Sequence, residues 1–323
     1  MSFLLRLFAL ALLLLPCAFS HAADRPPQYV IISFDGASFI EQWQRSRALA
    51  ARTGARFTYF LSCVYLLSPE TRQAYKAPGV KAGRSNVDYG FSREDVRLRL
   101  GQIWSARQEG HEIANHGCGH FDGSAWRVSD WQDEFRQFRT ILRDAWRING
   151  LEGEPAGWRA FAEGEVTGFR APYLAVSDRL YEALAREGFR YDASTVSRGP
   201  AKPATKGDLA RFSLPLIPEG PAEKRIIAMD YNLYVRHSGG LERPSEAELF
   251  ADRAFNAFLA AFEREYSSER VPLQLGFHFT LMNNGAYWQA LERFAEEVCG
   301  RAEVRCVSYR QYLDETERSA PKG

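Results

Sequence analysis

The segment QYVIISFDG, residues 28–36, decides the fold class of this 323-residue chain. Its apolar, β-branched beginning is typical of a strand that is buried on both faces. A helical pattern follows over residues 38–52, and a second apolar run covers residues 57–61. This order of strand, helix and strand predicts parallel pairing in an α/β protein.

The alternation of strand and helix patterns continues to the end of the chain. Parallel pairing of consecutive strands requires short, right-handed crossovers, and no linker divides the chain. The sequence therefore predicts one distorted (β/α) barrel with about seven parallel strands rather than two domains. The further strands are expected at residues 112–115, 166–169, 189–192, 212–217, 225–231, 273–279 and 304–309, and the further helices at 92–109, 129–148, 177–187, 245–266 and 285–298.

The first 22 residues have the pattern of a secretory signal peptide. Arg6 precedes an apolar run over residues 7–15, and small residues stand at the positions before a cleavage site at about Ala22. We therefore expect a mature domain of residues 23–323 that is exported to the periplasm or secreted. The apolar run is too short to span a membrane, which takes about 20 residues, and no later stretch approaches that length.

The composition indicates an ordinary globular protein without an affinity for nucleic acid. Hydrophobic residues make up 46% of the chain and charged residues 25%, which is enough to form a full core. The formal net charge of +1 falls to 1 − 1 = 0 when the leader with Arg6 is removed. Without a basic excess there is no electrostatic reason to expect nucleic acid as a partner.

Four cysteines remain in the predicted mature chain, an even number that indicates disulfides in an exported protein. They allow three pairings. We favour Cys63 with Cys118, which would tie a strand end to a histidine-rich loop, and Cys299 with Cys306, which would close a helix-to-strand turn. Cys17 leaves a lipoprotein open as an alternative, although the residue before it is not a small one.

The segment HEIANHGCGH, residues 111–120, carries two histidines four residues apart. The glycines between His116 and His120 permit a tight turn after a strand, so both imidazoles can point the same way. Such a pair suits a divalent metal ion, because catalytic sites need only two or three protein ligands. A pair at this spacing is also common in loops that bind no metal, so this interpretation depends on the rest of the chain.

The other polar candidates also follow predicted strands. Each has an ordinary structural interpretation, such as a turn for Asp35, a surface ion pair for Arg170, a loop cap for Asp192 or a core position for His278. In a (β/α) barrel, however, the loops after the strands meet at one face, which carries the active site. The coincidence of all these residues with His116 and His120 predicts a single catalytic site.

The order of these motifs resembles that of the polysaccharide deacetylase family (carbohydrate esterase family 4), which includes chitin, chito-oligosaccharide and peptidoglycan deacetylases. The resemblance runs from about Tyr29 to Tyr309. Its five motifs correspond here to Ser33-Phe34-Asp35-Gly36, His116-Gly117-Cys118-Gly119-His120, Gly168-Phe169-Arg170-Ala171-Pro172-Tyr173, Tyr191-Asp192-Ala193-Ser194 and Leu275-Gly276-Phe277-His278.

The resemblance implies a metal-dependent hydrolase that removes acetyl groups from a cell-surface or extracellular polysaccharide, with an acetylated glycan as partner. His116 and His120 would hold a divalent ion, zinc first and cobalt, nickel or manganese as alternatives, which activates water and polarises the acetyl carbonyl. Asp35 would act as general base or as third metal ligand, and Arg170 would orient it. The backbone N–H of Tyr173 would help to hold the oxyanion.

The resemblance also implies which residue acts as the general acid and which residue orients it. His278 would protonate the leaving amine, and Asp192 would keep the imidazole charged and aligned. The sequence does not indicate the oligomeric state.

One departure from the family pattern leaves alternatives open. The first motif of the family has two adjacent aspartates, a base and a metal ligand, whereas this chain has Asp35 followed by Gly36. We favour the base position for Asp35, because that alignment needs no gap, and Asp122 is a candidate substitute carboxylate. The alternative functions are an O-acetyl esterase acting on a glycan and a glycan-binding member that has lost catalysis.

Several aromatic residues near the predicted strand ends could contact the apolar faces of a sugar. Each could equally be an ordinary core residue. They are Trp126, Tyr173, Tyr231, Tyr234, Tyr287 and Trp288.

Overall fold

The computed structural model describes residues 25–319. The predicted signal peptide lies outside these residues. Within residues 25–319, no helix combines the length and the apolar character that crossing a membrane would require.

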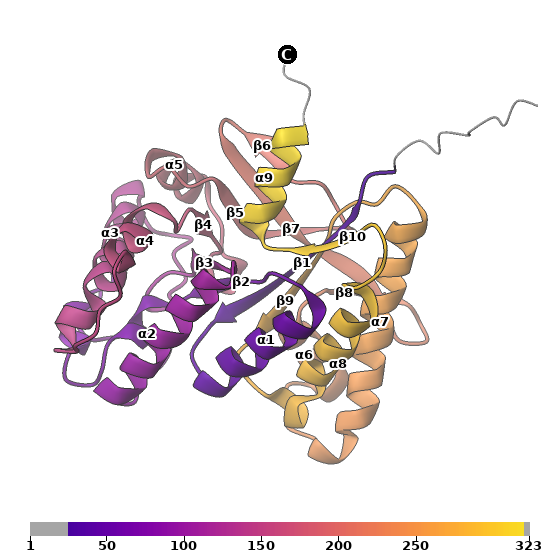
Figure 1. Ribbon diagram of the computed structural model, residues 1–323, viewed down its shortest axis with the longest axis horizontal. Helices are drawn as coiled ribbons and strands as arrows, with labels where there is room; N and C mark the ends of the chain where they lie inside the picture. Colours follow the sequence, from indigo (N-terminus) through magenta and orange to yellow (C-terminus); the bar gives the residue numbers. More distant parts are fainter. Residues whose placement is uncertain (1–24, 320–323) are drawn as a thin grey trace, which may run out of the picture.

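A curled sheet of mostly parallel strands forms the centre of the molecule (Figure 1). The strand order is β10-β1-β2-β3-β4-β5-β7-β6, with β9 paired to β1 and β8 paired to β7. The parallel strands are β1 (Gln28–Gly36), β2 (Thr58–Leu61), β3 (Glu112–Asn115), β4 (Gly168–Phe169), β5 (Tyr191–Ser197), β7 (Leu209–Glu219), β9 (Leu273–His278) and β10 (Val304–Val307), and the antiparallel strands are β6 (Ala204–Lys206) and β8 (Lys224–Ile227).

The sheet curls until the segment after β8 joins its two sides. The N–H of Ala228 donates to the carbonyl of Pro215 on β7, and the N–H of Gly276 on β9 donates to the carbonyl of Ala228, each at 2.9 Å. Met229 forms a parallel bridge with Gly276. The predicted distorted (β/α) barrel is therefore confirmed, with more parallel strands in the described chain than the seven expected.

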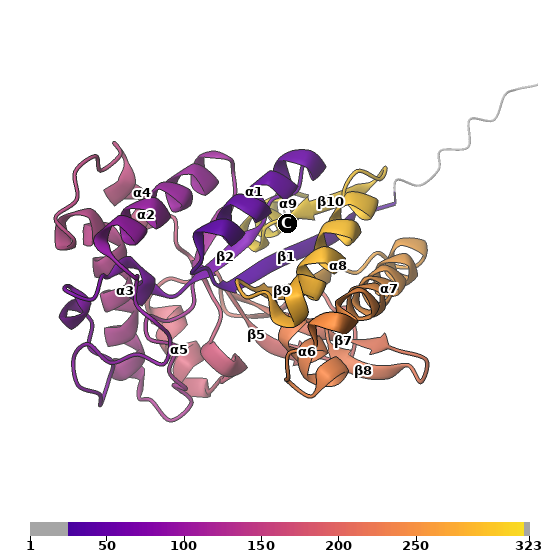
Figure 2. The same ribbon diagram turned by 90° about the horizontal axis from the view of Figure 1, so that it is seen from below.

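Helices surround the sheet (Figure 2). They are α1 (Ile40–Thr53), α2 (Arg93–Gln108), α3 (Val128–Ile148), α4 (Trp158–Gly164), α5 (Asp178–Arg186), α6 (Asp230–Ser238), α7 (Ala247–Ser267), α8 (Met282–Val298) and α9 (Tyr309–Ser319), with short 3₁₀ turns η1 (Cys63–Leu66), η2 (Arg72–Ala74), η3 (Pro172–Leu174) and η4 (Pro244–Glu246).

The prediction of a strand at residues 225–231 is wrong for the second half of that segment. The strand ends at Ile227, and Asp230 begins α6, which the sequence did not predict. The aromatic and β-branched residues of this segment suggest a strand, but an aspartate in the first turn favours a helix through the helix dipole. Helices α4 and α9 were also not predicted.

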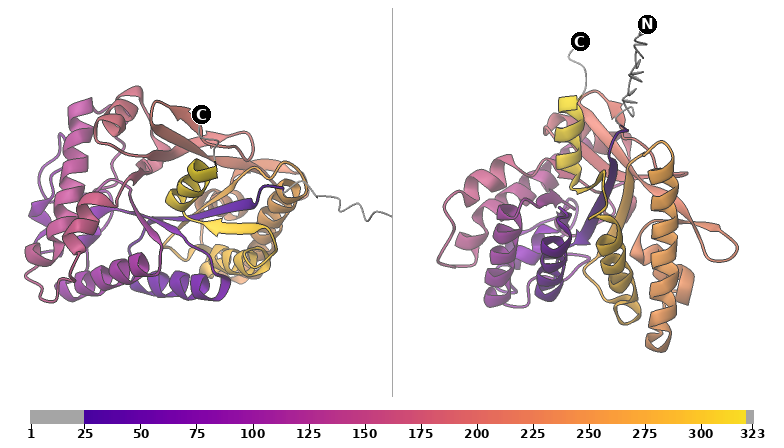
Figure 3. Two further views of the ribbon diagram at one scale, coloured as in Figure 1. Left: turned by 45° about the horizontal axis from the view of Figure 1, so that its top comes forward. Right: turned by 45° about the vertical axis from the view of Figure 1, so that its right-hand side comes forward.

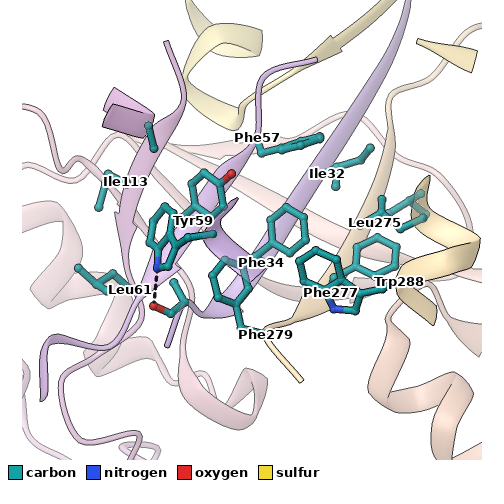
Figure 4. Packing of buried hydrophobic residues seen from close by; sticks show 14 of the residues in the cluster. Ile32, Phe34, Phe57, Tyr59, Leu61, Ile113, Leu275, Phe277, Phe279 and Trp288 are labelled. Carbon is teal, nitrogen blue, oxygen red and sulfur yellow. Dashed lines mark hydrogen bonds between the residues drawn. The ribbon is translucent and has the colours of Figure 1, made fainter. Parts of the chain in front are cut away.

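The alternation of side chains along β1 separates two environments. Val30, Ile32 and Phe34 pack in the core beneath the outer helices, where Phe34 stacks on Trp288 with ring centroids 5.2 Å apart (Figure 4). Ile31 belongs instead to the cluster inside the curl of the sheet. Because the period of a strand is two, Asp35 also faces the inside.

Helix α9 covers the amino ends of the strands (Figure 3). The N–H of Tyr309 donates to the hydroxyl of Thr58 at 3.1 Å, and the N–H of Arg310 donates to the carboxylate of Glu112 at 3.0 Å. Since Thr58 and Glu112 are the first residues of β2 and β3, this end of the barrel is closed. An active site that needs access to solvent is therefore expected at the carboxyl ends of the strands.

Both favoured disulfides are confirmed. Cys63 is bonded to Cys118, and Cys299 is bonded to Cys306. The first joins η1 to the loop that follows β3, and the second joins the end of α8 to β10.

Removing the two disulfides is expected to cost different amounts of stability. The sequence separations are 55 and 7 residues, so loop-closure entropy predicts a loss of about 4 kcal/mol for the Cys63/Cys118 double alanine variant and about 2.4 kcal/mol for the Cys299/Cys306 variant. Urea unfolding of the two variants and the parent chain measures both losses. A larger loss for the Cys299/Cys306 variant would contradict the entropic account.

Candidate active site

Asp35 and Arg170 form a buried ion pair at the carboxyl end of β1. Nη1 of Arg170 donates to Oδ1 of Asp35 at 2.7 Å and to the hydroxyl of Ser33 at 2.9 Å. The guanidinium also lies over the ring of Phe60, 4.3 Å from its centroid. Burial is the largest single influence on the pKa of Asp35 and would raise it, but the charge and hydrogen bond of Arg170 together with the nearby histidines outweigh burial and lower the pKa below its usual value. The carboxylate is therefore ionised at neutral pH.

His116 and His120 lie together in the loop after β3, with ring centroids 5.0 Å apart. Nδ1 of His116 donates to the carbonyl of Arg170 at 2.8 Å, which leaves its Nε2 as an acceptor. Burial lowers the pKa of His116 to about 3 and also lowers the pKa of His120, so both imidazoles are neutral. The negative charge of Asp35 acts on both rings, which places the three groups in one neighbourhood.

This pair fits a divalent metal in its donor chemistry. Neutral imidazole nitrogen is a preferred ligand of zinc and related ions, and a carbonyl bond to the other ring nitrogen is the usual support for such a ligand. Among residues 25–319, however, no three His, Cys, Asp or Glu side chains form a group that could hold a metal ion. Asp35, whose Oδ1 is bonded to Arg170, does not complete such a group with His116 and His120.

The turn after β4 places Tyr173 beside His120. Tyr173 and Leu174 both have left-handed backbone angles, with φ of 58° and 55°. In this turn the N–H of Leu174 donates to the carbonyl of Ala171. The Tyr173 ring is 61% exposed and meets the His120 ring edge-on at 4.7 Å. Strained backbone of this kind is typical of functional sites.

His278 lies at the end of β9 and is held by Asp230. Nδ1 of His278 contacts Oδ1 of Asp230 at 2.7 Å, and the backbone N–H of His278 donates to Oδ2 at 2.7 Å. Burial is the largest single influence and opposes the charged imidazole, but the charge and hydrogen bond of Asp230, together with the charge of Asp35, outweigh burial and raise the pKa of His278 above its usual value. The charge of His278 also acts on Asp35 and His120. All of these side chains therefore lie at the carboxyl ends of the strands.

The predicted contact between Asp192 and His278 is wrong. Asp192 instead accepts the hydroxyl of Ser194 at 2.5 Å, and that hydroxyl accepts the N–H of Ala171 at 2.7 Å. Next to it, Nε of Arg170 donates to the carbonyl of Ala193 at 2.9 Å. Burial raises the pKa of Asp192 to about 6. The aspartate thus supports the loop that carries Arg170, because β5 lies beside β4 in the sheet.

Asp122 makes a local turn instead of supplying a substitute carboxylate. Its Oδ1 accepts the backbone N–H of Ser124 at 2.9 Å, and hydrogen bonds from the side chain and the backbone of Ser124 lower the pKa of Asp122. Among the described residues, its hydrogen bond is with Ser124 and not with His116 or His120.

The aromatic candidates differ in their exposure to solvent. Tyr287 and Trp288 are buried core residues, and Nε1 of Trp288 donates to the carbonyl of His278 at 2.9 Å. Tyr231 is 54% exposed, and its ring centroid lies 6.2 Å from that of His278. Tyr173 and Tyr231 therefore remain as exposed aromatic rings beside the site.

Two residues of the site were missed from sequence. Asp230 was missed because it lies in a segment whose sequence resembles a strand. The feature that could have revealed it is an acidic residue directly after an apolar run. Glu134 is buried on α3, and its signal was an acid within the apolar stripe that contains Trp131 and Phe138.

Comparison with known proteins shows which folds this chain resembles. No protein-family model matches the chain. Chitin deacetylase 1 of Bombyx mori is 24% identical over 221 residues, which cover 61% of this chain and 38% of that protein, so the chain spans well under half of its length. A solved structure from Mycobacterium smegmatis, described as a candidate polysaccharide deacetylase, is similar with a TM-score of 0.56 at 17% identity and covers 92% of both chains. The chain has the fold of the polysaccharide deacetylase family.

This similarity confirms the resemblance that the motif order indicates. The fold is also similar to that of 4-alpha-glucanotransferase from Thermococcus litoralis, with a TM-score of 0.52 at 12% identity over 90% of this chain and 40% of that one. Because related folds carry different chemistry, the activity of this polysaccharide deacetylase fold has to be argued from its side chains.

Proposed function

We propose that this protein is a metal-dependent hydrolase that removes acetyl groups, N-acetyl first, from a cell-surface or extracellular polysaccharide. The observation that carries the proposal is the meeting of three units at one end of the barrel. These are the ionised Asp35 with Arg170, the neutral pair His116 and His120, and His278 with its own carboxylate. A base, a metal-binding pair and an acid are the parts that amide hydrolysis requires.

Different residues of the chain have different roles in the proposed reaction. A divalent ion on His116 and His120 would supply Lewis acidity toward water and the acetyl carbonyl. Oδ1 of Asp35 is occupied by Arg170, so Oδ2 takes the proton of the attacking water. The N–H of Tyr173 donates to the oxygen on which negative charge develops.

The leaving group is protonated on the other side of the site. Nδ1 of His278 is held by Asp230, so Nε2 faces the substrate and donates its proton to the departing nitrogen. This assigns to Asp230 the orienting role that the sequence had given to Asp192.

Acetate release tests the proposal. The purified chain, loaded with zinc or cobalt, is incubated with N-acetylglucosamine oligomers and with acetylated xylan. Release from the oligomers supports the N-deacetylase, and release from xylan alone supports the O-acetyl esterase. Absence of acetate from either substrate, together with absence of bound metal, would overturn the hydrolase and favour the glycan-binding alternative.

Replacing Asp230 by asparagine is expected to move the alkaline limb of the kcat/KM profile to lower pH. His278 acts when protonated, and its proton is present below its pKa and lost above it. The charge of Asp230 raises that pKa, so an uncharged amide lets the proton leave at lower pH. Asp192→Asn, which alters a carboxylate without contact to His278, is the matched control. An alkaline limb at the same pH in Asp230→Asn and parent would contradict the assignment.

We also propose that the protein is exported. The leader pattern of the first 22 residues and the two disulfides support this, because disulfides persist in oxidising compartments. Amino-terminal sequencing of the mature protein recovered outside the cytoplasm tests it, and an intact Met1 on that protein would contradict cleavage near Ala22.

A further inference from the structure

A buried carboxylate from α3 enters the loop that carries the two histidines. Glu134 is only 1% exposed, and its Oε1 accepts the backbone N–H of Cys118 at 2.6 Å. Both of its oxygens accept the hydroxyl of Tyr75, at 3.1 and 3.0 Å. Among the described residues, the ion pairs of the chain include none with Glu134. Its charge is therefore balanced by hydrogen bonds alone.

Three successive N–H groups of the histidine loop are held by side chains. The N–H of Gly117 donates to Oδ1 of Asn115 at 2.7 Å, the N–H of Cys118 donates to Glu134, and the N–H of Gly119 donates to the hydroxyl of Tyr75 at 3.1 Å. This is the whole stretch between His116 and His120. The position of both imidazoles thus depends on these acceptors.

The packing around the loop leaves little room for another arrangement. A Cβ on Gly119 would lie 2.7 Å from a ring carbon of Tyr75 and 2.7 Å from a ring carbon of Phe121. His120 itself has a left-handed backbone with φ of 53°. A strained loop of this kind keeps its shape only when its surroundings determine it.

A general contribution to folding would not explain why this acceptor is a carboxylate. Burial makes an ionised carboxylate costly, and it raises the pKa of Glu134 to about 7. An amide would present an N–H₂ group to the same donors. Both carboxylate oxygens can only accept when ionised, so both can face the hydroxyl of Tyr75 while Oε1 also accepts the N–H of Cys118.

We propose that Glu134 and Tyr75 are positioning residues that hold His116 and His120 in the geometry for binding a divalent ion. The inference rests on the proposed function, since it concerns the same metal. Metal affinity would then depend on α3, which carries Glu134, and on the connection before α2, which carries Tyr75. Supports of metal ligands outside the coordination sphere typically change affinity by 10- to 100-fold.

Cobalt titration of the full mature chain tests the proposal, because the visible spectrum of Co²⁺ reports the ligand geometry as well as the affinity. Glu134→Gln and Tyr75→Phe are each expected to weaken Co²⁺ binding by at least about 10-fold and to alter the spectrum. Because the two residues share one hydrogen bond, the double variant should lose less than the product of the single losses.

The control lies on the same helix. Asp144 of α3 is also a buried carboxylate, but it pairs with Arg143, Arg147 and Arg159 instead of the histidine loop. Asp144→Asn is therefore expected to lower the stability of the chain without changing Co²⁺ affinity. Equal affinities and spectra for parent, Glu134→Gln and Tyr75→Phe would overturn the inference and leave the proposed function intact. A parent chain that binds no Co²⁺ and releases no acetate would overturn both.

Discussion

Replacing His116 by alanine is expected to abolish divalent-metal binding and to lower acetate release by at least about 10³-fold, or about 4 kcal/mol of transition-state stabilisation. His116 supplies one of only two imidazoles in the loop, and its ring is fixed by the carbonyl of Arg170. With alanine, His120 remains as a single imidazole, which is too few protein ligands for a stable site. Zinc content by mass spectrometry and kcat/KM measure the two losses.

A second buried histidine provides the control. His111 lies just before β3, and its Nδ1 accepts the N–H of Phe57 at 3.0 Å, away from the site. His111→Asn keeps an acceptor in that place and should retain metal and activity. Turnover in His116→Ala equal to that of the parent would end the hydrolase interpretation.

Replacing Asp35 by asparagine is expected to separate the two roles that the sequence left open. If Asp35 is the base, kcat falls by roughly 10³-fold while the zinc content of the protein stays close to one ion per chain. The ion pair with Arg170 supports this outcome, because it holds the carboxylate ionised with one oxygen occupied. Loss of zinc together with activity would instead assign Asp35 to the metal.

The same substitution has a cost in stability that must be measured beside the kinetics. Arg170 is fully buried, and asparagine leaves its charge without a counter-ion. Breaking a buried pair in this way costs about 3 to 5 kcal/mol. Urea unfolding of Asp35→Asn, with the folded fraction checked at the assay temperature, separates loss of fold from loss of chemistry.

The sequence predicts the parts of the site that depend on short-range pattern. Asp35 follows a strand whose period of two turns it inward, and the two histidines share one loop, so each could be placed from its neighbours in sequence. The parallel order of strands then brings their carboxyl ends to one face. The same reasoning places Arg170 beside Asp35 although they lie far apart in the chain.

The contacts that the sequence did not predict are long-range side-chain choices. Whether Asp192 or Asp230 meets His278 depends on how the barrel closes between β7 and β9, where an irregular segment replaces a regular strand. The pattern of residues along the chain does not show how the barrel closes between these two strands. Glu134 was missed for a related reason, because its position on the apolar face of α3 has meaning only once Tyr75 and the histidine loop are packed against it.

Diffraction from crystals of the mature chain soaked in zinc would locate the metal ion. We expect one anomalous peak in contact with the imidazoles of both His116 and His120, with Asp35 still bonded to Arg170. A zinc peak at other residues, or the absence of any peak in crystals of an active preparation, would contradict it.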